Sequence, residues 1–270
     1  MHWLLPLLSR LGVSLVSKPL LVLNQVSKNF GGVQAVKELS FSVNPSEIVG
    51  LIGPNGSGKS TSVNLISGTL PVNTGGIEFA GQSVNHLDIS ARVPLGLSRT
   101  FQTTSVFPEF SVLDQVLTGC HTQYGLSPLS AVLRLPGSRA EETEQRRKAH
   151  KIIDFVGLSD VAQEPASAIS SAQQRLLMIG TALASEPRLV LLDEPAAGMV
   201  AKERKDLSRL ILGIQAQGIA VLLIEHHMGL IMEVCERIVV LNFGQKIAEG
   251  VPAEIRANPA VIDAYLGGAH

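Results

Sequence analysis

The segment Gly53–Thr61, GPNGSGKST, decides the fold class of this 270-residue chain. It follows the apolar run Ile48–Ile52 (IVGLI) and precedes the apolar residues Val63, Leu65 and Ile66, so we predict a strand, a loop and a helix. Glycines let the backbone bend until its N–H groups point inward, and a helix start adds partial positive charge. The pattern G-x-x-x-x-G-K-[S/T] therefore predicts a loop that binds nucleotide phosphates.

All nine residues of this loop are candidate ATP-binding residues. They are Gly53, Pro54, Asn55, Gly56, Ser57, Gly58, Lys59, Ser60 and Thr61. The Lys59 ammonium can reach the β and γ phosphates, and the Ser60 hydroxyl can be a ligand of Mg²⁺. The alternative is a glycine-rich turn with an exposed lysine, which the flanking strand and helix disfavour.

Two acidic residues follow a second buried run. The segment LVLLDEP places Asp193 and Glu194 at the end of a strand over 189–192. Ligands of α/β sheets lie beyond the carboxyl ends of the strands. Asp193 is suited to hold Mg²⁺ through its waters, and Glu194 to orient and deprotonate the attacking water. Alone, such a pair usually marks a turn or a helix start, but with the phosphate loop it predicts hydrolysis.

A third apolar run, over 219–224, leads to His226. A histidine there could donate a hydrogen bond to the γ-phosphate and hold the water in line. It could also be a core histidine, or share a metal site with His227. Adjacent residues of an extended chain face opposite ways, which disfavours the metal site. With the other motifs present, we interpret His226 as a phosphate sensor.

Composition excludes several classes of protein. Hydrophobic residues make up 45% and charged residues 17%, which indicates a packed interior. The net charge of −1 lacks the basic excess of nucleic-acid binders, so we expect no nucleic-acid partner. Cys120 and Cys235 are too few for a disulfide framework and are expected to be buried thiols. Arg10 and Lys18 interrupt the apolar start, so we expect no membrane span there, and the start is a poor signal peptide.

Buried strands that alternate with helices predict an α/β fold with a mostly parallel sheet. We expect a flexible N-terminal extension over 1–19 and a single domain over 20–270. The range from about 90 to 185 has few strand signals and is expected to be a helical insertion. The run Leu20–Val26 alternates loosely and is expected to be an edge strand, and RIVVLNFG after residue 236 is expected to turn into another strand.

The motifs GPNGSGKST, RTFQ, QQR, LLDEP and IEHH occur in that order. Together they resemble the ATP-binding subunit of an ABC transporter, from about Leu20 to the C-terminus. The segments SKNFGGVQAV, RTFQTTSVFPEFSVLDQVL, LLDEPAAG, VLLIEHHM and IRANPAVIDAYLG are similar to the branched-chain amino acid importer branch.

The resemblance implies a P-loop NTPase fold of the ABC type, with a mostly parallel core sheet, an antiparallel β subdomain and a helical subdomain insertion. It implies an ATPase that powers import, with ATP and Mg²⁺ bound. Phe30 would stack on adenine. Gln102 would sense Mg²⁺ and the γ-phosphate, joining Ser60 and Asp193 at the metal and Glu194 and His226 in catalysis.

The resemblance also implies partners. These would be two integral-membrane permease subunits, a second ATP-binding subunit that is identical or different, and indirectly a periplasmic or extracellular solute-binding protein. The chain would then lie peripherally at the cytoplasmic face of the cell membrane. Permeases and binding proteins choose the cargo, so branched-chain amino acids, related amino acids, urea and short amides all remain alternatives.

Two positions depart from the family pattern. The signature, which normally reads LSGGQ and acts on the nucleotide of the partner subunit, here reads ISSAQ, with signature residues Ser170, Ser171, Ala172 and Gln173. Val200 stands where the family usually has Asp or Asn. We infer either an asymmetric pair in which this chain's own site is competent, or a catalytically weakened regulatory subunit. A soluble ABC ATPase acting on ribosomes or DNA is disfavoured, because the chain has neither tandem ATP domains nor a long coiled-coil insertion.

Overall fold

Six strands form the central sheet of the computed structural model, which describes residues 18–100, 106–120 and 136–266. Their order is β10-β9-β3-β8-β7-β6. The strands are β3 (Ile48–Ile52), β6 (Leu97–Arg99), β7 (Leu189–Asp193), β8 (Ala220–Ile224), β9 (Arg237–Asn242) and β10 (Gln245–Gly250). All neighbours are parallel except β9 and β10. The expected mostly parallel sheet is confirmed, as is the expected turn after β9.

The two faces of the central sheet contact two separate hydrophobic cores. Ile48 and Ile52 of β3 face one core, and Val49 and Leu51 face the other. Strands β7 and β8 divide their side chains in the same alternating way. Because both faces are covered, every residue of these three strands is buried, which explains why Asp193 at the end of β7 is their only charged residue.

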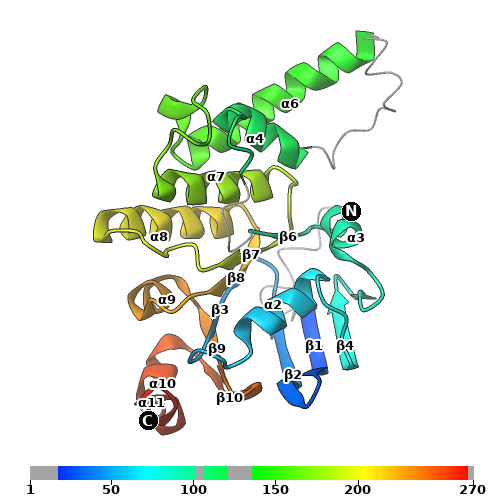
Figure 1. Ribbon diagram of the computed structural model, residues 1–270, viewed down its shortest axis with the longest axis vertical. Helices are drawn as coiled ribbons and strands as arrows, with labels where there is room; N and C mark the ends of the chain where they lie inside the picture. The colour runs from blue at the N-terminus through cyan, green and yellow to red at the C-terminus, as the bar shows by residue number, and fades with distance from the viewer. Residues whose placement is uncertain (1–17, 101–105, 121–135, 267–270) are drawn as a thin grey trace, which may run out of the picture.

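A smaller antiparallel sheet packs over one face of the central sheet (Figure 1). Its order is β2-β1-β4-β5, formed by β1 (Leu21–Phe30), β2 (Val33–Val43), β4 (Thr74–Phe79) and β5 (Gln82–Ser83). The expected antiparallel β subdomain is therefore present. The edge position expected for the first strand is wrong, because β1 pairs with β2 on one side and with β4 on the other.

Helices cover the rest of the central sheet. Helix α2 (Lys59–Ser67) belongs to the core beneath the antiparallel sheet, and α8 (Ala201–Ala216) and α9 (Met228–Val234) cover the opposite face. Beyond α8, helices α4 (Val112–Gly119), α6 (Pro136–Phe155) and α7 (Ser171–Leu183) pack against one another, at the top of Figure 1.

Shorter elements complete the fold. They are α3 (Ile89–Arg92), α10 (Pro252–Ala257), α11 (Pro259–Leu266) and the 3₁₀ turns Val93–Leu95 and Ser159–Val161. The range 90–185 also contains β6, a three-residue strand of the central sheet that we did not predict. The N-terminal extension lies outside the described residues up to residue 17. Among the described helices, none is both long and apolar enough to cross a bilayer. Both cysteines are free and buried, as expected.

Candidate functional site

The loop between β3 and α2 has a backbone that requires glycine at two positions. Gly53 and Gly58 have φ angles of 151° and 100°. A Cβ atom would lie 2.1 Å from the Leu241 carbonyl oxygen at Gly53, and 2.5 Å from the Ala35 carbonyl oxygen at Gly58. Gly58 is also the N-cap of α2, so the helix begins at Lys59 with its N-terminus at the loop. This is the geometry that directs backbone N–H groups at an anion.

The Lys59 side chain folds back over the loop. Its Nζ atom donates hydrogen bonds to the carbonyl oxygens of Gly53, at 2.7 Å, and of Pro54, at 3.0 Å. Burial lowers the pKa of Lys59, and the negative charges of Glu194 and Asp193 oppose that shift. The structure therefore brings the predicted lysine and both predicted carboxylates together. Among the other predicted binding residues, Asn55, Gly56 and Ser60 are exposed, Pro54 and Thr61 are half-buried, and Ser57 is buried.

The C-terminal elements support this loop, which the sequence did not suggest. The N–H of Gly244, in the turn between β9 and β10, donates to the Ser57 carbonyl oxygen at 3.0 Å. Burial raises the pKa of Tyr265 on α11, and a hydrogen bond with the Gly53 backbone opposes that shift. The loop is therefore contacted from a part of the chain about 200 residues further on.

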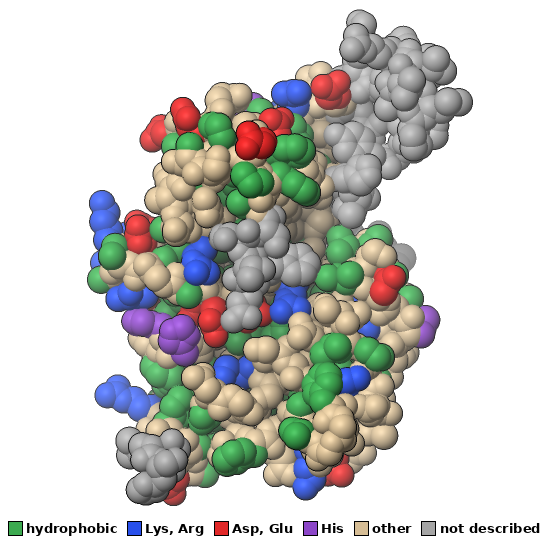
Figure 2. All heavy atoms as spheres, viewed as in Figure 1, with side chains coloured by type: hydrophobic (Ala, Val, Ile, Leu, Met, Phe, Trp, Pro, Cys, Tyr) green, Lys and Arg blue, Asp and Glu red, His purple; other side chains and the backbone are tan. Residues whose placement is uncertain are grey.

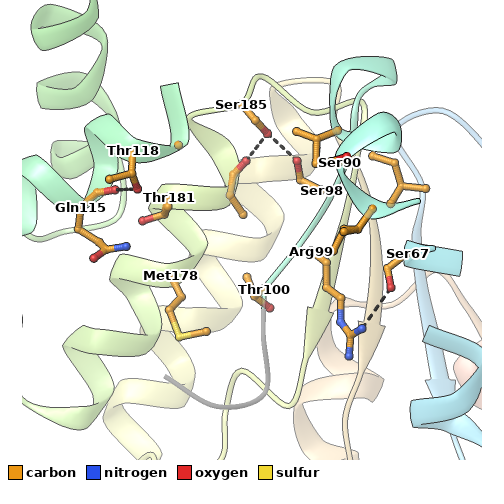
Figure 3. A pocket seen from close by; sticks show the side chains of 15 residues that line it. Ser67, Ser90, Ser98, Arg99, Thr100, Gln115, Thr118, Met178, Thr181 and Ser185 are labelled. Carbon is orange, nitrogen blue, oxygen red and sulfur yellow. Dashed lines mark hydrogen bonds between the residues drawn. The ribbon is translucent and has the colours of Figure 1, made fainter. Parts of the chain in front are cut away.

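Asp193 is the last residue of β7, and its side chain is 1% exposed. Its Oδ2 atom accepts a hydrogen bond from Arg99 Nη2 at 2.9 Å. Arg99 Nη1 also donates to Asn64 Oδ1 and Ser67 Oγ of α2, at 2.6 and 3.2 Å, and Figure 3 shows Arg99 and Ser67 directed toward each other. Arg99 thus joins the acidic residue to the loop helix. We did not predict a role for Arg99, whose only sequence signal is that it is the first residue of the RTFQ motif.

Glu194, the residue after Asp193, has a φ angle of 50°, which is unusual for a non-glycine residue. Its N–H donates to the Ile224 carbonyl oxygen of β8 at 2.8 Å, and its carbonyl oxygen accepts from Arg175 Nη1 of α7 at 3.3 Å. Its side chain is about one-third exposed, and Oε1 lies 4.0 Å from Nδ1 of His226. The predicted base and the predicted phosphate sensor are therefore neighbours at adjacent strand ends.

The two consecutive histidines have different environments. The His226 side chain is 65% exposed. His227 is the N-cap of α9, and its Nδ1 atom accepts from the Leu230 N–H at 3.3 Å. In the described part of the chain, no group of three or more histidine, cysteine or carboxylate side chains is arranged so that it could hold a metal ion. The His227 Nδ1 atom, which the disfavoured two-histidine metal site could use as a ligand, is thus engaged by a backbone N–H. Figure 2 shows histidine side chains (purple) beside acidic and basic side chains on one face of the molecule.

Of two further residues that the resemblance assigned to the nucleotide, the structure describes Phe30 but not Gln102. Phe30 ends β1 with its ring about half exposed, and Lys28 Nζ lies 5.5 Å from the ring centroid. The exposed face of Phe30 can accept a planar base. Gln102 lies outside the described residues.

A cavity of about 380 Å³ lies beside β6, between α3, α4 and α7. Arg99, Thr100 and Met178 are among its lining residues (Figure 3).

The signature residues form the start of α7. Ser170 is the N-cap, its Oγ accepts from the Gln173 N–H at 3.2 Å, and Gln173 Oε1 accepts from the Ser170 N–H at 2.9 Å. Ser170 and Ser171 are exposed, whereas Ala172 is half-buried and packs against the core. Val200 is the N-cap of α8, is 61% exposed, and has a side chain that cannot accept a hydrogen bond.

Comparison with known proteins identifies the family. A family model described as "ABC transporter" matches residues 36–197, and one described as "Branched-chain amino acid ATP-binding cassette transporter" matches residues 245–270. LivG of Escherichia coli (strain K12), a high-affinity branched-chain amino acid transport ATP-binding protein, is 38% identical over 93% of this chain and 99% of its own length. A probable LivG of Methanocaldococcus jannaschii is 34% identical over 90% and 95%.

Comparison with solved structures leads to the same family. An ATP-binding cassette of an ABC transporter in an ADP conformation superposes with a TM-score of 0.81 at 33% identity, covering 93% of this chain and all of the other. A nucleotide-free cassette gives 0.80 at 33% identity, covering 92% and 98%. The predicted fold and the predicted family are thereby confirmed, and the chain belongs to the ABC transporter family as one of its ATP-binding cassettes.

Proposed function

We propose that this chain binds and hydrolyses ATP to power an ABC importer for branched-chain or related amino acids. The observation that carries the proposal is the placement of Lys59, in a glycine-lined loop at a helix start, within electrostatic reach of Asp193 and Glu194. Family membership supports hydrolysis coupled to transport, and the names of the relatives support the cargo.

Binding is proposed to use the loop and α2. The triphosphate would replace the carbonyl oxygens of Gly53 and Pro54 as the partners of Lys59 Nζ. The backbone N–H groups of the loop and the N-terminal end of α2 supply further positive potential. Phe30 would stack on the adenine from the end of β1. The nucleotide would then contact both the central sheet and the antiparallel sheet.

The oxygen ligands at this site fit Mg²⁺. Ser60 lies exposed in the first turn of α2, and the Asp193 carboxylate, whose Oδ2 atom accepts from Arg99 in this structure, lies at the end of β7. Mg²⁺ prefers hard oxygen ligands and commonly uses one or two carboxylates plus substrate phosphates. When bound, Mg²⁺ would neutralise phosphate charge. Gln102 would complete the ligand set, as the family resemblance implies.

Hydrolysis is proposed to use Glu194 and His226. Glu194 would orient the attacking water and accept its proton, and His226, with Nδ1 4.0 Å from Glu194 Oε1, would donate a hydrogen bond to the γ-phosphate. Gln102 would report the state of the γ-phosphate to the membrane subunits. Catalysis of this kind is mainly positioning and charge stabilisation.

The proposed assembly contains two permease subunits, a second ATP-binding subunit and, indirectly, a solute-binding protein. Membership of the ABC transporter family supports a working association with membrane permeases. We place the chain peripherally at the cytoplasmic face of the membrane, as one domain from residue 20 onward with a helical insertion over about 90–185. Urea or short amides remain alternative cargoes.

Two substitutions test this function. Lys59→Ala should weaken ATP binding, because the loop loses the ammonium that reaches the phosphates. Glu194→Gln should retain ATP binding and lose turnover in the assembled transporter. Binding is measured by calorimetry and turnover by phosphate release. Retained turnover in the Glu194→Gln chain would remove Glu194 from the role of base.

A second candidate function follows from the ISSAQ signature and Val200. If these residues weaken the partner's nucleotide site while this chain's own site is intact, the pair is asymmetric. Glu194→Gln should then cost more ATP hydrolysis than the equivalent change in the partner subunit. Equal losses would rule out the asymmetry, and absence of turnover in the wild-type complex would favour a regulatory subunit.

A further inference from the structure

Glu225 is a buried carboxylate to which the roles proposed above assign no task. It follows the last residue of β8 and is 1% exposed. Its Oε1 atom accepts a hydrogen bond from the Ala196 N–H at 2.7 Å. Its Oε2 atom accepts from the N–H groups of His226 and His227, at 3.1 and 3.3 Å. A buried charge is unfavourable unless it is hydrogen-bonded, and these three backbone donors meet that requirement.

The partners of Glu225 belong to the two segments that carry the proposed base and sensor. Ala196 lies two residues after Glu194, in the segment that follows β7, and His226 lies in the segment that follows β8. The His226 Nδ1 atom lies 4.0 Å from Glu194 Oε1 and 3.9 Å from Glu225 Oε2. One side chain therefore connects the backbones that set the distance between Glu194 and His226.

The backbone of Glu194 needs such a connection. Its left-handed conformation is unfavourable for a residue with a Cβ atom and persists only where its surroundings restrain it. The restraints include the hydrogen bond from its N–H to Ile224, those from Arg175 and from the Ala197 N–H to its carbonyl oxygen, and the one from the Ala196 N–H to Glu225. Glu225 supplies the last of these through its side chain.

We propose that Glu225 is a positioning residue for ATP hydrolysis, which holds Glu194 and His226 at a fixed separation by binding the backbone that follows each strand. The inference rests on the proposed function of the site. It assigns Glu225 no contact with the nucleotide. An amide cannot replace the carboxylate, because it has one acceptor oxygen and its NH₂ group would face a backbone N–H.

The test compares Glu225→Gln with Glu254→Gln in the full chain, assembled in its transporter complex. Glu254 also accepts a backbone N–H, from Val251 at 3.1 Å, but on α10. We expect Glu225→Gln to lower kcat about 10- to 100-fold, with the KM for ATP and the affinity for ATP retained, as displaced catalytic groups do. Glu254→Gln should keep the wild-type kcat. Wild-type turnover in the Glu225→Gln chain would overturn the proposal.

A double-mutant cycle separates positioning from general destabilisation. If Glu225 acts on the geometry between base and sensor, Glu225→Gln should cost little further turnover once His226→Ala has removed the sensor. Equal fold-losses with and without His226 would show a merely structural role. Glu225→Asp keeps the charge but cannot reach both segments, so it should also lower kcat, and it takes the place of Glu225→Gln in the cycle if that chain does not fold.

The controls distinguish this inference from the proposed function. If the wild-type complex does not hydrolyse ATP, or if Glu194→Gln leaves turnover intact, the proposed function is wrong. If both controls behave as expected and Glu225→Gln has wild-type kcat, only the positioning role of Glu225 is wrong.

Discussion

Replacing Arg92 by methionine should destabilise the chain strongly, although Arg92 is remote from the phosphates. Arg92 is 2% exposed, and burial lowers its pKa to about 10, so it stays protonated at neutral pH. Its guanidinium group donates four hydrogen bonds of 2.6 to 3.0 Å. The acceptors are the carbonyl oxygens of Leu65, Ile66, Val84 and Leu87. The first two lie in the last turn of α2, where a cation also complements the helix dipole.

The hydrogen-bond partners of Arg92 determine how much the free energy of unfolding decreases in the Arg92→Met variant. The carbonyl oxygens of Leu65 and Val84 keep a backbone donor, so the substitution mainly affects those of Ile66 and Leu87. A buried carbonyl left without a partner costs about 1–3 kcal/mol. Two of them, with the lost dipole interaction, give a decrease of about 3–5 kcal/mol in the free energy of unfolding. Methionine retains much of the aliphatic stem, which limits the cavity term.

Urea unfolding followed by far-UV circular dichroism measures this loss. Arg209→Met is the matched control, because Arg209 is 67% exposed and forms a surface ion pair with Asp206 at 2.9 Å. Such a pair contributes about 0–1 kcal/mol. If both variants lost the same small amount, the buried guanidinium would not hold the C-terminal end of α2, and the reasoning would be refuted.

Three further predictions concern the loop, a helix cap and pH. Gly58→Ala should abolish measurable ATP binding by calorimetry while Gly56→Ala, whose Cβ would meet no atom within 4 Å, loses less; equal losses would contradict the steric argument. Val200→Asp should raise the free energy of unfolding by about 1 kcal/mol in urea titrations, because it supplies the missing cap of α8; no gain would show that the cap is unimportant. Burial raises the pKa of Cys235 from 9.0 to about 12, so above pH 9 only the unfolded chain ionises this thiol. Its contribution to stability should then fall by about 1.4 kcal/mol per pH unit up to pH 12, and Cys235→Ala should show a correspondingly shallower decline.

The core strands were predictable because burial on both faces leaves no room for polar residues. The predicted strand Ile48–Ile52 has the bounds observed for β3, and the run over 189–192 differs from β7 by one residue. The loop was equally predictable, since its glycines are required by φ and by close backbone contacts. In these segments, local sequence and tertiary structure impose the same constraint.

Other features depend on partners that are distant in the sequence. Whether β1 lies at an edge depends on β4, and the three residues of β6 are too few for a periodic pattern. Arg99 contacts Asp193, 94 residues away, and Glu225 contacts Ala196, 29 residues away. A local sequence pattern cannot reveal the role of a single polar residue when that role depends on a partner far away in the sequence.

The contact between α11 and the phosphate loop has a practical consequence. Tyr265 interacts with the Gly53 backbone, while Asp263 on the same helix is exposed. A dye attached at position 263 would lie outside the loop yet on the helix that touches it. Its fluorescence could report in real time whether a nucleotide occupies the phosphate loop. A bulky tag fused next to α11 would disturb that fluorescence signal.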